Sequence, residues 1–141
     1  MKKLIRPLQL LILPIIIASF ATVANASDLE KEMKNIGRNT KALKQSIADP
    51  AKKDEALGEI GQMIKSAEKA KTLTPKKAGE IPENDRTKFI EDYQKQIGGM
   101  IQQFKKIEAD LTAGKTDDAK ADFEKIGGMK RDGHEKFAAK D

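Results

Sequence analysis

The chain has 141 residues, with 27 Lys and Arg against 22 Asp and Glu, and it contains neither cysteine nor tryptophan. The absence of cysteine excludes disulfides, so stability must come from packing, helped or not by a bound ligand. No block of lysine and arginine is interleaved with aromatic residues, which argues against nucleic-acid binding despite a formal net charge of +5.

Residues 1–26 have the layout of a secretory signal peptide. Three cations in residues 2–6 precede an apolar run over residues 10–20, and the tripeptide Ala-Asn-Ala at 24–26 fits a cleavage site. The run is shorter than the roughly 20 residues that span a bilayer, with an uncleaved anchor as the alternative. We expect export to the periplasm, no stable membrane insertion after cleavage, and one domain over residues 27–141. That domain carries 24 basic and 22 acidic residues, a net charge of +2.

The first predicted helix begins at Ser27, because Ser27 followed by Glu30 is the pattern of a capping box. Its apolar residues recur in steps of four and three, as in the seam of a bundle helix. They are Leu29, Met33, Ile36, Leu43 and Ile47, with Thr40 in the remaining position. Asp49 and Pro50 end this helix and start a second one that runs to about Thr72, because Asp suits an N-cap and Pro the first helical position. The second stripe is predicted as Leu57, Ile60, Ile64, Ala67 and Ala70.

The two remaining helices follow a connection rich in proline and glycine over residues 73–85. Apolar residues at helical spacing over residues 89–111 predict the third helix. Gly114 is expected just past its C-terminus, and Thr116 is expected as the N-cap of a fourth helix that continues to about Ala139. Four helices with one apolar stripe each predict an all-α fold, an antiparallel up-down-up-down four-helix bundle.

Each predicted helix also contains an Ile-Gly pair near its middle. Glycine inside a helix costs on the order of 1 kcal/mol relative to alanine. The pairs therefore allow a close approach of helices or a flexible ligand-free state, or they are present by chance and locally tolerated. The pairs are Ile36-Gly37, Ile60-Gly61, Ile97-Gly98 and Ile126-Gly127.

His134 is the only histidine of the chain. In an up-down-up-down bundle the start of the first helix and the end of the fourth lie at the same end, and at 1.5 Å per residue Met33 and His134 are each roughly 8 Å from it. A thioether and an imidazole aimed at one interior point would hold a haem from its two faces. The pattern alone is not specific, because such a methionine usually fills the core and a histidine near a helix C-terminus is usually solvated. The remaining walls at this level are expected from Ala67, Ala70, Phe89 and Tyr93, with Gly133 leaving space.

Several segments resemble the cytochrome b562 family. Residues 28–33 resemble the start of the family's first helix, where a methionine ligates haem b, and residues 55–70 are similar to its second helix without a gap. Thr74-Pro75 resembles the family's Thr-Pro turn, and the spacing from Gly114-Lys115 to His134 matches that from its Gly-Lys turn to its haem-ligating histidine. The resemblance covers essentially the whole of residues 27–141, and it implies that Met33 and His134 are the axial iron ligands.

The chain departs from the family at three places near the expected site. Lys130 stands where the family has an arginine four residues before its histidine, Gly133 stands where an aromatic residue is found, and two haem-packing phenylalanines correspond to Tyr93 and Ile97. The residues expected to contact the haem are Leu29, Met33, Ile36, Tyr93, Ile97, Lys130 and His134.

A haem with both axial positions filled by protein shuttles one electron and leaves no position for a substrate, so we expect an electron carrier and not an enzyme. Without a Cys-x-x-Cys-His motif the haem is a non-covalent haem b. Transient redox partners are expected to dock at the haem edge, where Lys130, Arg131 and Lys136 would attract an acidic surface, and we expect a monomer. The alternative is a haem-free periplasmic bundle that binds a partner protein or a metal. An enzyme is a third hypothesis, without a paired nucleophile and base to support it.

Overall fold

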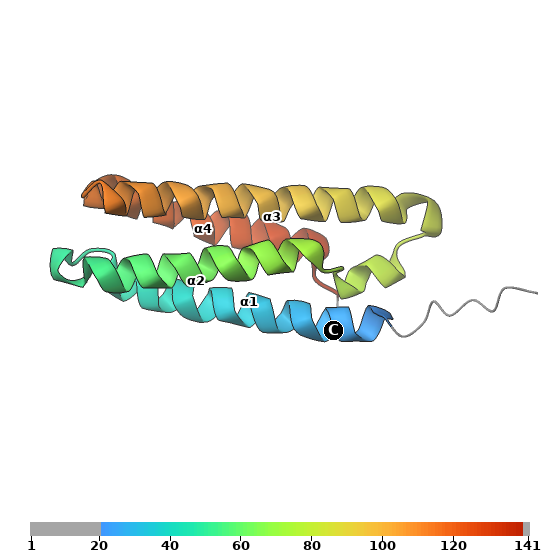
Figure 1. The fold of residues 1–141 in the computed structure, drawn as a ribbon. Helices are drawn as coiled ribbons and strands as arrows, with labels where there is room; N and C mark the ends of the chain where they lie inside the picture. Colours follow the sequence, from blue (N-terminus) through green and yellow to red (C-terminus); the bar gives the residue numbers. More distant parts are fainter. Residues whose placement is uncertain (1–20, 140–141) are drawn as a thin grey trace, which may run out of the picture.

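The computed structural model describes residues 21–139, so residues 1–20 of the predicted signal peptide lie outside it. The chain forms four long helices, α1 (Ala21–Ser46), α2 (Lys53–Thr72), α3 (Glu83–Thr112) and α4 (Thr116–Phe137). Two short 3-10 helices, η1 (Pro50–Lys52) and η2 (Lys76–Glu80), lie in the connections before α2 and α3. The helices alternate in direction along a common axis (Figure 1), which confirms the all-α four-helix bundle.

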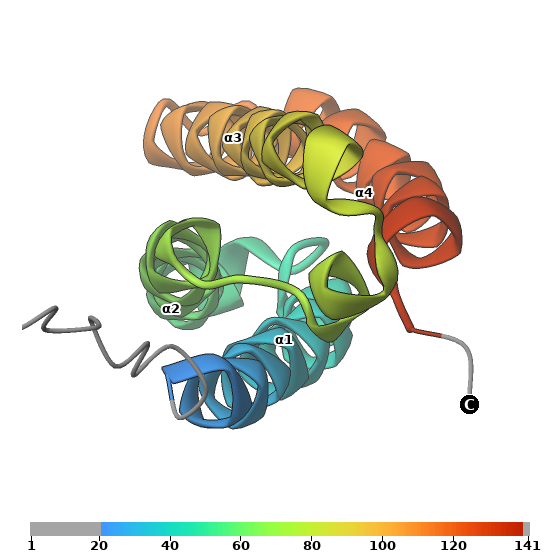
Figure 2. The ribbon, with the colours of Figure 1, turned by 90° about the vertical axis from the view of Figure 1, so that its right-hand side faces the viewer.

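The four helices follow one another around the bundle, as the view along its axis shows (Figure 2). Close packing joins α1 to α2, α2 to α3, and α3 to α4, whereas α1 and α4 are hardly in contact. At the end where α1 begins, η2 packs against α1 and α3. The bundle is therefore incompletely closed along the seam between its first and last helices. Within residues 21–139, no helix is both long and apolar enough to cross a membrane.

The core follows the predicted stripe in α1, where Leu29, Ile36, Leu43 and Ile47 are buried. In α4, by contrast, Lys130 and His134 are exposed. The innermost side chains, which are almost completely buried, include Leu43, Ile60, Phe104 and Ile107. The prediction for α2 was wrong in part, because Leu57 and Ile64 are only half-buried. The fully buried residues at a bundle spacing of four and three are instead Ala56, Ile60, Met63, Ala67 and Ala70. Both faces flanking Ile60 carry apolar residues, so the sequence pattern did not determine the rotation of α2 about its axis.

Two predicted helix starts were wrong. Ser27 lies inside α1, which already begins at Ala21, because the preceding residues are compatible with a helix and continue it. Thr116 is the first residue of α4, and Lys115 occupies the N-cap position without a side-chain cap. The prediction for Asp49 is confirmed in that its carboxylate accepts a hydrogen bond of 2.9 Å from the main-chain N–H of Ala51, although it caps η1 and α2 itself begins later.

The turn between α3 and α4 depends on Gly114, which has a φ of 75°. Its N–H donates to the Leu111 carbonyl at 3.1 Å, and the N–H of Lys115 donates to the Asp110 carbonyl at 2.8 Å. These two bonds form a Schellman motif and satisfy carbonyls at the end of α3. The left-handed conformation favours glycine there, as predicted.

The glycines of the Ile-Gly pairs do not mediate close contacts between helices. A Cβ added to Gly37, Gly61 or Gly127 would meet no neighbouring atom within 4 Å, and one added to Gly98 would meet only the flexible end of Lys71. The prediction that these glycines allow a close approach of helices is therefore wrong.

We predict opposite effects for alanine at two of the glycines. Gly61→Ala should stabilise the fold by about 0.5–1 kcal/mol, because it restricts the unfolded chain without a clash in α2. Gly114→Ala should destabilise it by about 1 kcal/mol, because alanine is strained at a positive φ. Urea unfolding of both variants checks the pair; stabilisation by Gly114→Ala would contradict the role of this turn.

A buried carboxylate links α3 to α4 near the turn between them. Asp122 is only 3% exposed, and it accepts hydrogen bonds from Lys106 of α3 and, at 2.6 Å, from Lys125 of α4. The hydrogen bond from Lys106 is the main reason why the pKa of Asp122 lies well below its usual value of 3.8, and it raises the pKa of Lys106 to about 12. The side chain of Gln103 also donates to the main-chain carbonyl of Asp122 at 2.8 Å.

We predict that Asp122→Asn lowers the unfolding midpoint at pH 7. Because the folded protein holds this carboxyl at a lowered pKa, its contribution is present above pH 3.8 and is lost as the pH falls through the folded value. The difference from the unmodified chain should therefore shrink towards about pH 2. Thermal unfolding at several pH values measures it, with the exposed Asp118→Asn on the same helix as a control. An equal loss of stability at every pH would contradict the ion-pair account.

Candidate functional site

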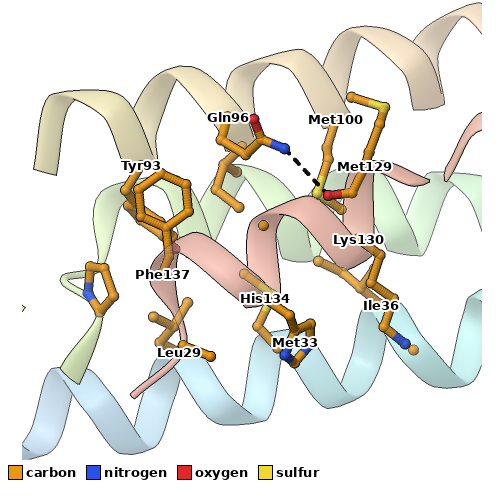
Figure 3. A pocket seen from close by; sticks show the side chains of 15 residues that line it. Leu29, Met33, Ile36, Tyr93, Gln96, Met100, Met129, Lys130, His134 and Phe137 are labelled. Atoms are coloured by element: carbon orange, nitrogen blue, oxygen red, sulfur yellow. Dashed lines mark hydrogen bonds between the residues drawn. The ribbon is translucent and has the colours of Figure 1, made fainter. Parts of the chain in front are cut away.

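A cavity of about 150 Å³ opens between α1, α3 and α4 at the end of the bundle where α1 begins (Figure 3). It lies along the seam where α1 and α4 fail to pack. Its walls are almost entirely apolar. They consist of Leu29, Met33, Ile36 and Gly37 from α1, Tyr93, Gln96, Ile97 and Met100 from α3, Met129, Lys130, Gly133, His134 and Phe137 from α4, and the flanking residues Pro75 and Ala138.

The structure brings all seven residues that the sequence singled out to this one cavity. The expectation that α2 would supply a wall was wrong, since Ala67 and Ala70 are fully buried elsewhere and do not line the cavity. The reason is the arrangement of the bundle: α2 packs against α1 and α3, on the far side from the α1–α4 seam. Phe89 is also absent from the cavity wall and packs behind it.

Met33 and His134 lie on opposite sides of the seam. Met33 extends from α1 and is half-buried, whereas His134 belongs to the last turn of α4 and is exposed. The two side chains stand at the same level of the cavity in Figure 3. A thioether and an imidazole thus border one space from two helices that make little other contact.

The end of the cavity is closed by a cluster of aromatic rings. Phe137 packs edge-on against Phe89 and Tyr93, with ring centroids 5.3 and 5.6 Å apart. The Tyr93 hydroxyl donates a hydrogen bond of 2.7 Å to the Ala70 carbonyl, so its polar end points to α2 and only its ring faces the cavity. Lys136 holds the end of α4 to α3 through an ion pair of 3.2 Å with Asp92.

Sequence reasoning missed four substantial residues of the cavity wall. These are Gln96, Met100, Met129 and Phe137. Gln96, Met100 and Phe137 lie three residues after Tyr93, Ile97 and His134, which were predicted. The helical period could therefore have identified them. Gln96 also ties α3 to α4, because its side-chain amide donates to the Met129 carbonyl at 3.3 Å.

The chemistry of the wall suits a flat, apolar, metal-containing group. No carboxylate lines the cavity, and Lys130 and His134 are its titratable residues besides Tyr93. Within residues 21–139, no group of three or more His, Cys, Asp or Glu side chains is placed to hold a bare metal ion. Apolar walls with the imidazole of His134 and the thioether of Met33 on facing helices fit haem, whose iron accepts both ligands.

An antiparallel bundle with such a cavity between facing helices belongs to the cofactor-binding four-helix bundles. The sequence matches the family model of cytochrome b562 over residues 28–138, and the chain therefore belongs to the cytochrome b562 family. This is a family of haem-binding, electron-transfer helical bundles. No curated protein matches the chain closely enough to add to this assignment.

We predict that the only tyrosine of the chain ionises together with unfolding. Burial raises the pKa of Tyr93 above its ordinary value of 10.0, so the stability it contributes is complete below pH 10 and is lost as the pH rises further. Tyrosinate absorbance should appear only as helical circular dichroism disappears. Tyr93→Phe should cost about 1 kcal/mol at pH 7 and move the alkaline transition to higher pH. A tyrosinate signal near pH 10 with all helices intact would contradict this.

Proposed function

We propose that this protein is a periplasmic electron carrier that binds one haem b non-covalently, with Met33 and His134 as the axial ligands of the iron. The observation that carries the proposal is the apolar cavity between α1 and α4, bordered by the only histidine and by a methionine from opposite sides. The family assignment supports haem binding and electron transfer as the general role.

Different residues of the chain would bind the iron, surround the macrocycle and pair with a haem carboxylate. Met33 and His134 supply a sulfur and a nitrogen, and a bound haem would supply a one-electron couple whose potential is raised by the methionine. Leu29, Ile36 and Ile97 keep water from the macrocycle. Lys130, which is exposed on the cavity rim, is the cation available to a haem carboxylate.

Binding of so large a group requires the seam to widen. The cavity of about 150 Å³ is smaller than the 300–1,000 Å³ that is typical of small-molecule sites. Because α1 and α4 are hardly in contact, moving α4 outward breaks few interactions along this seam. His134 must be neutral to bind iron, and its exposed position allows water to accept a hydrogen bond from its second ring nitrogen.

Electron exchange would occur through transient docking at the open side of the cavity. Of the three cations expected there, Arg131 is paired with Asp132 at 3.5 Å and Lys136 with Asp92 at 3.2 Å. Such pairing reduces the net attraction to an acidic partner, so steering rests mainly on Lys130. We propose weak, short-lived complexes of a monomeric carrier.

We predict that the two proposed ligands have separable spectroscopic signatures. The protein purified with haem should give the sharp, split visible bands of six-coordinate low-spin iron on reduction. Met33→Leu keeps the side-chain volume and removes the sulfur, so it should turn the spectrum high-spin while haem remains bound. His134→Ala should weaken haem binding strongly. Met63→Leu, a matched change in the core away from the cavity, should leave the spectrum unchanged.

Absorbance spectra of oxidised and reduced protein test both haem binding and the assignment of the two ligands. If no Soret band develops when haem is added to the wild-type chain, the protein is a haem-free bundle and the proposal fails. If Met33→Leu and His134→Ala both retain the low-spin spectrum, haem binds but the ligand assignment is wrong.

A further inference from the structure

The cavity gathers most of the sulfur of the folded domain. The chain has five methionines, and of the four within residues 21–139 three line this cavity. These are Met33, Met100 and Met129, whereas Met63 is fully buried elsewhere in the core. The only histidine lines the same cavity. One iron needs only one of these sulfurs, so the concentration of thioethers exceeds what the proposed haem site uses.

The three methionines reach the cavity from three helices, Met33 from α1, Met100 from α3 and Met129 from α4. In Figure 3 the side chain of Met100 extends from α3 into the bundle, towards the main chain of α4. Met129 instead extends from α4 along α3, and its methyl group would lie 3.6 Å from a Cβ added to Gly99. Met33, Met100 and His134 thus border one cavity from α1, α3 and α4.

This donor set is specific for a soft metal. Thioether sulfur selects Cu(I), whereas Zn²⁺, Ca²⁺, Mg²⁺ and Mn²⁺ prefer carboxylate, carbonyl, imidazole or thiolate ligands. The cavity wall contains no carboxylate, and there is no cysteine in the chain. We propose that the haem-free protein binds one Cu(I) ion through Met33, Met100 and His134.

The surroundings of these donors favour a monovalent ion and allow the ligands to converge. Lys130 is the fixed positive charge on the wall, and it repels a monovalent ion less than a divalent one. Methionine has three rotatable bonds and a flexible thioether, so both sulfurs can change position within the cavity. His134 is exposed at the mouth, which gives the ion access from solvent.

The copper site shares Met33 and His134 with the proposed haem site but does not depend on haem binding. Haem and Cu(I) must therefore exclude each other. Met100 distinguishes the two sites, because it is proposed to bind copper and not iron. If the wild-type protein binds haem but not Cu(I), the copper proposal has failed. If it binds Cu(I) but not haem, the proposed haem function has failed.

The test uses haem-free protein, purified after expression of the full chain, under ascorbate and without oxygen. Cu(I) is offered as its coloured complex with bicinchoninate, and its transfer to the protein is followed by the loss of colour. We expect withdrawal of one Cu(I) per chain, and displacement of that Cu(I) when haem is added. Met33→Leu and Met100→Leu should each weaken Cu(I) binding by about tenfold or more, since removal of even outer partners of a metal site costs 10–100-fold.

Met63→Leu serves as the control, because it removes a buried sulfur that is not at the cavity. Met100→Leu should retain the helical circular dichroism and the urea midpoint of Met63→Leu, which shows that the variant folds and that its copper defect is local. Failure of the wild-type protein to withdraw Cu(I) overturns the proposal. Cu(I) binding by Met100→Leu that equals that of Met63→Leu overturns it as well.

Discussion

The first and last helices, α1 and α4, make hardly any contact with each other, and this determines where the bundle is open. Three of the four neighbouring helix pairs pack closely, and the fourth pair faces across a cavity. The residues along this seam explain why. Gly37 and Gly133 contribute no side-chain volume, and Lys130 and His134 are polar, so these positions offer little apolar area to bury between the two helices.

The two ends of the bundle have different physical roles. At the turn between α3 and α4, the Schellman motif and the buried Asp122 fix the helices to each other without reference to a ligand. At the opposite end, α4 is held to α3 by Phe137 and Lys136 but makes hardly any contact with α1. The firm end keeps the register of α4 while the open end can admit a cofactor.

The predictability of the fold from sequence follows from the same distinction. The helices and most of their buried faces were predictable because apolar residues recur at bundle spacing, and Gly114 was predictable because its turn requires a positive φ. The rotation of α2 was not, since Leu57 and Ile64 compete with Ala56 and Met63 for the core, and only the size of the neighbouring side chains decides between them.

The members of the site were predictable more fully than its shape. Topology and spacing placed Met33 and His134 at one level, but they did not reveal that α2 would be excluded or that His134 would be exposed. Both features depend on how far α1 and α4 stand apart. That separation is a property of the packed bundle as a whole, and the spacing of residues within one helix does not determine it.

Proton nuclear magnetic resonance of the reduced, haem-loaded protein shows directly whether Met33 binds the iron. The methyl group of an iron-bound methionine lies over the porphyrin ring, whose ring current shifts its resonance far upfield. The account predicts one such three-proton resonance in the wild-type protein and its loss in Met33→Leu. Its absence from the wild-type spectrum, or its persistence in Met33→Leu, would contradict the assignment of Met33 as the ligand that faces His134 across the seam.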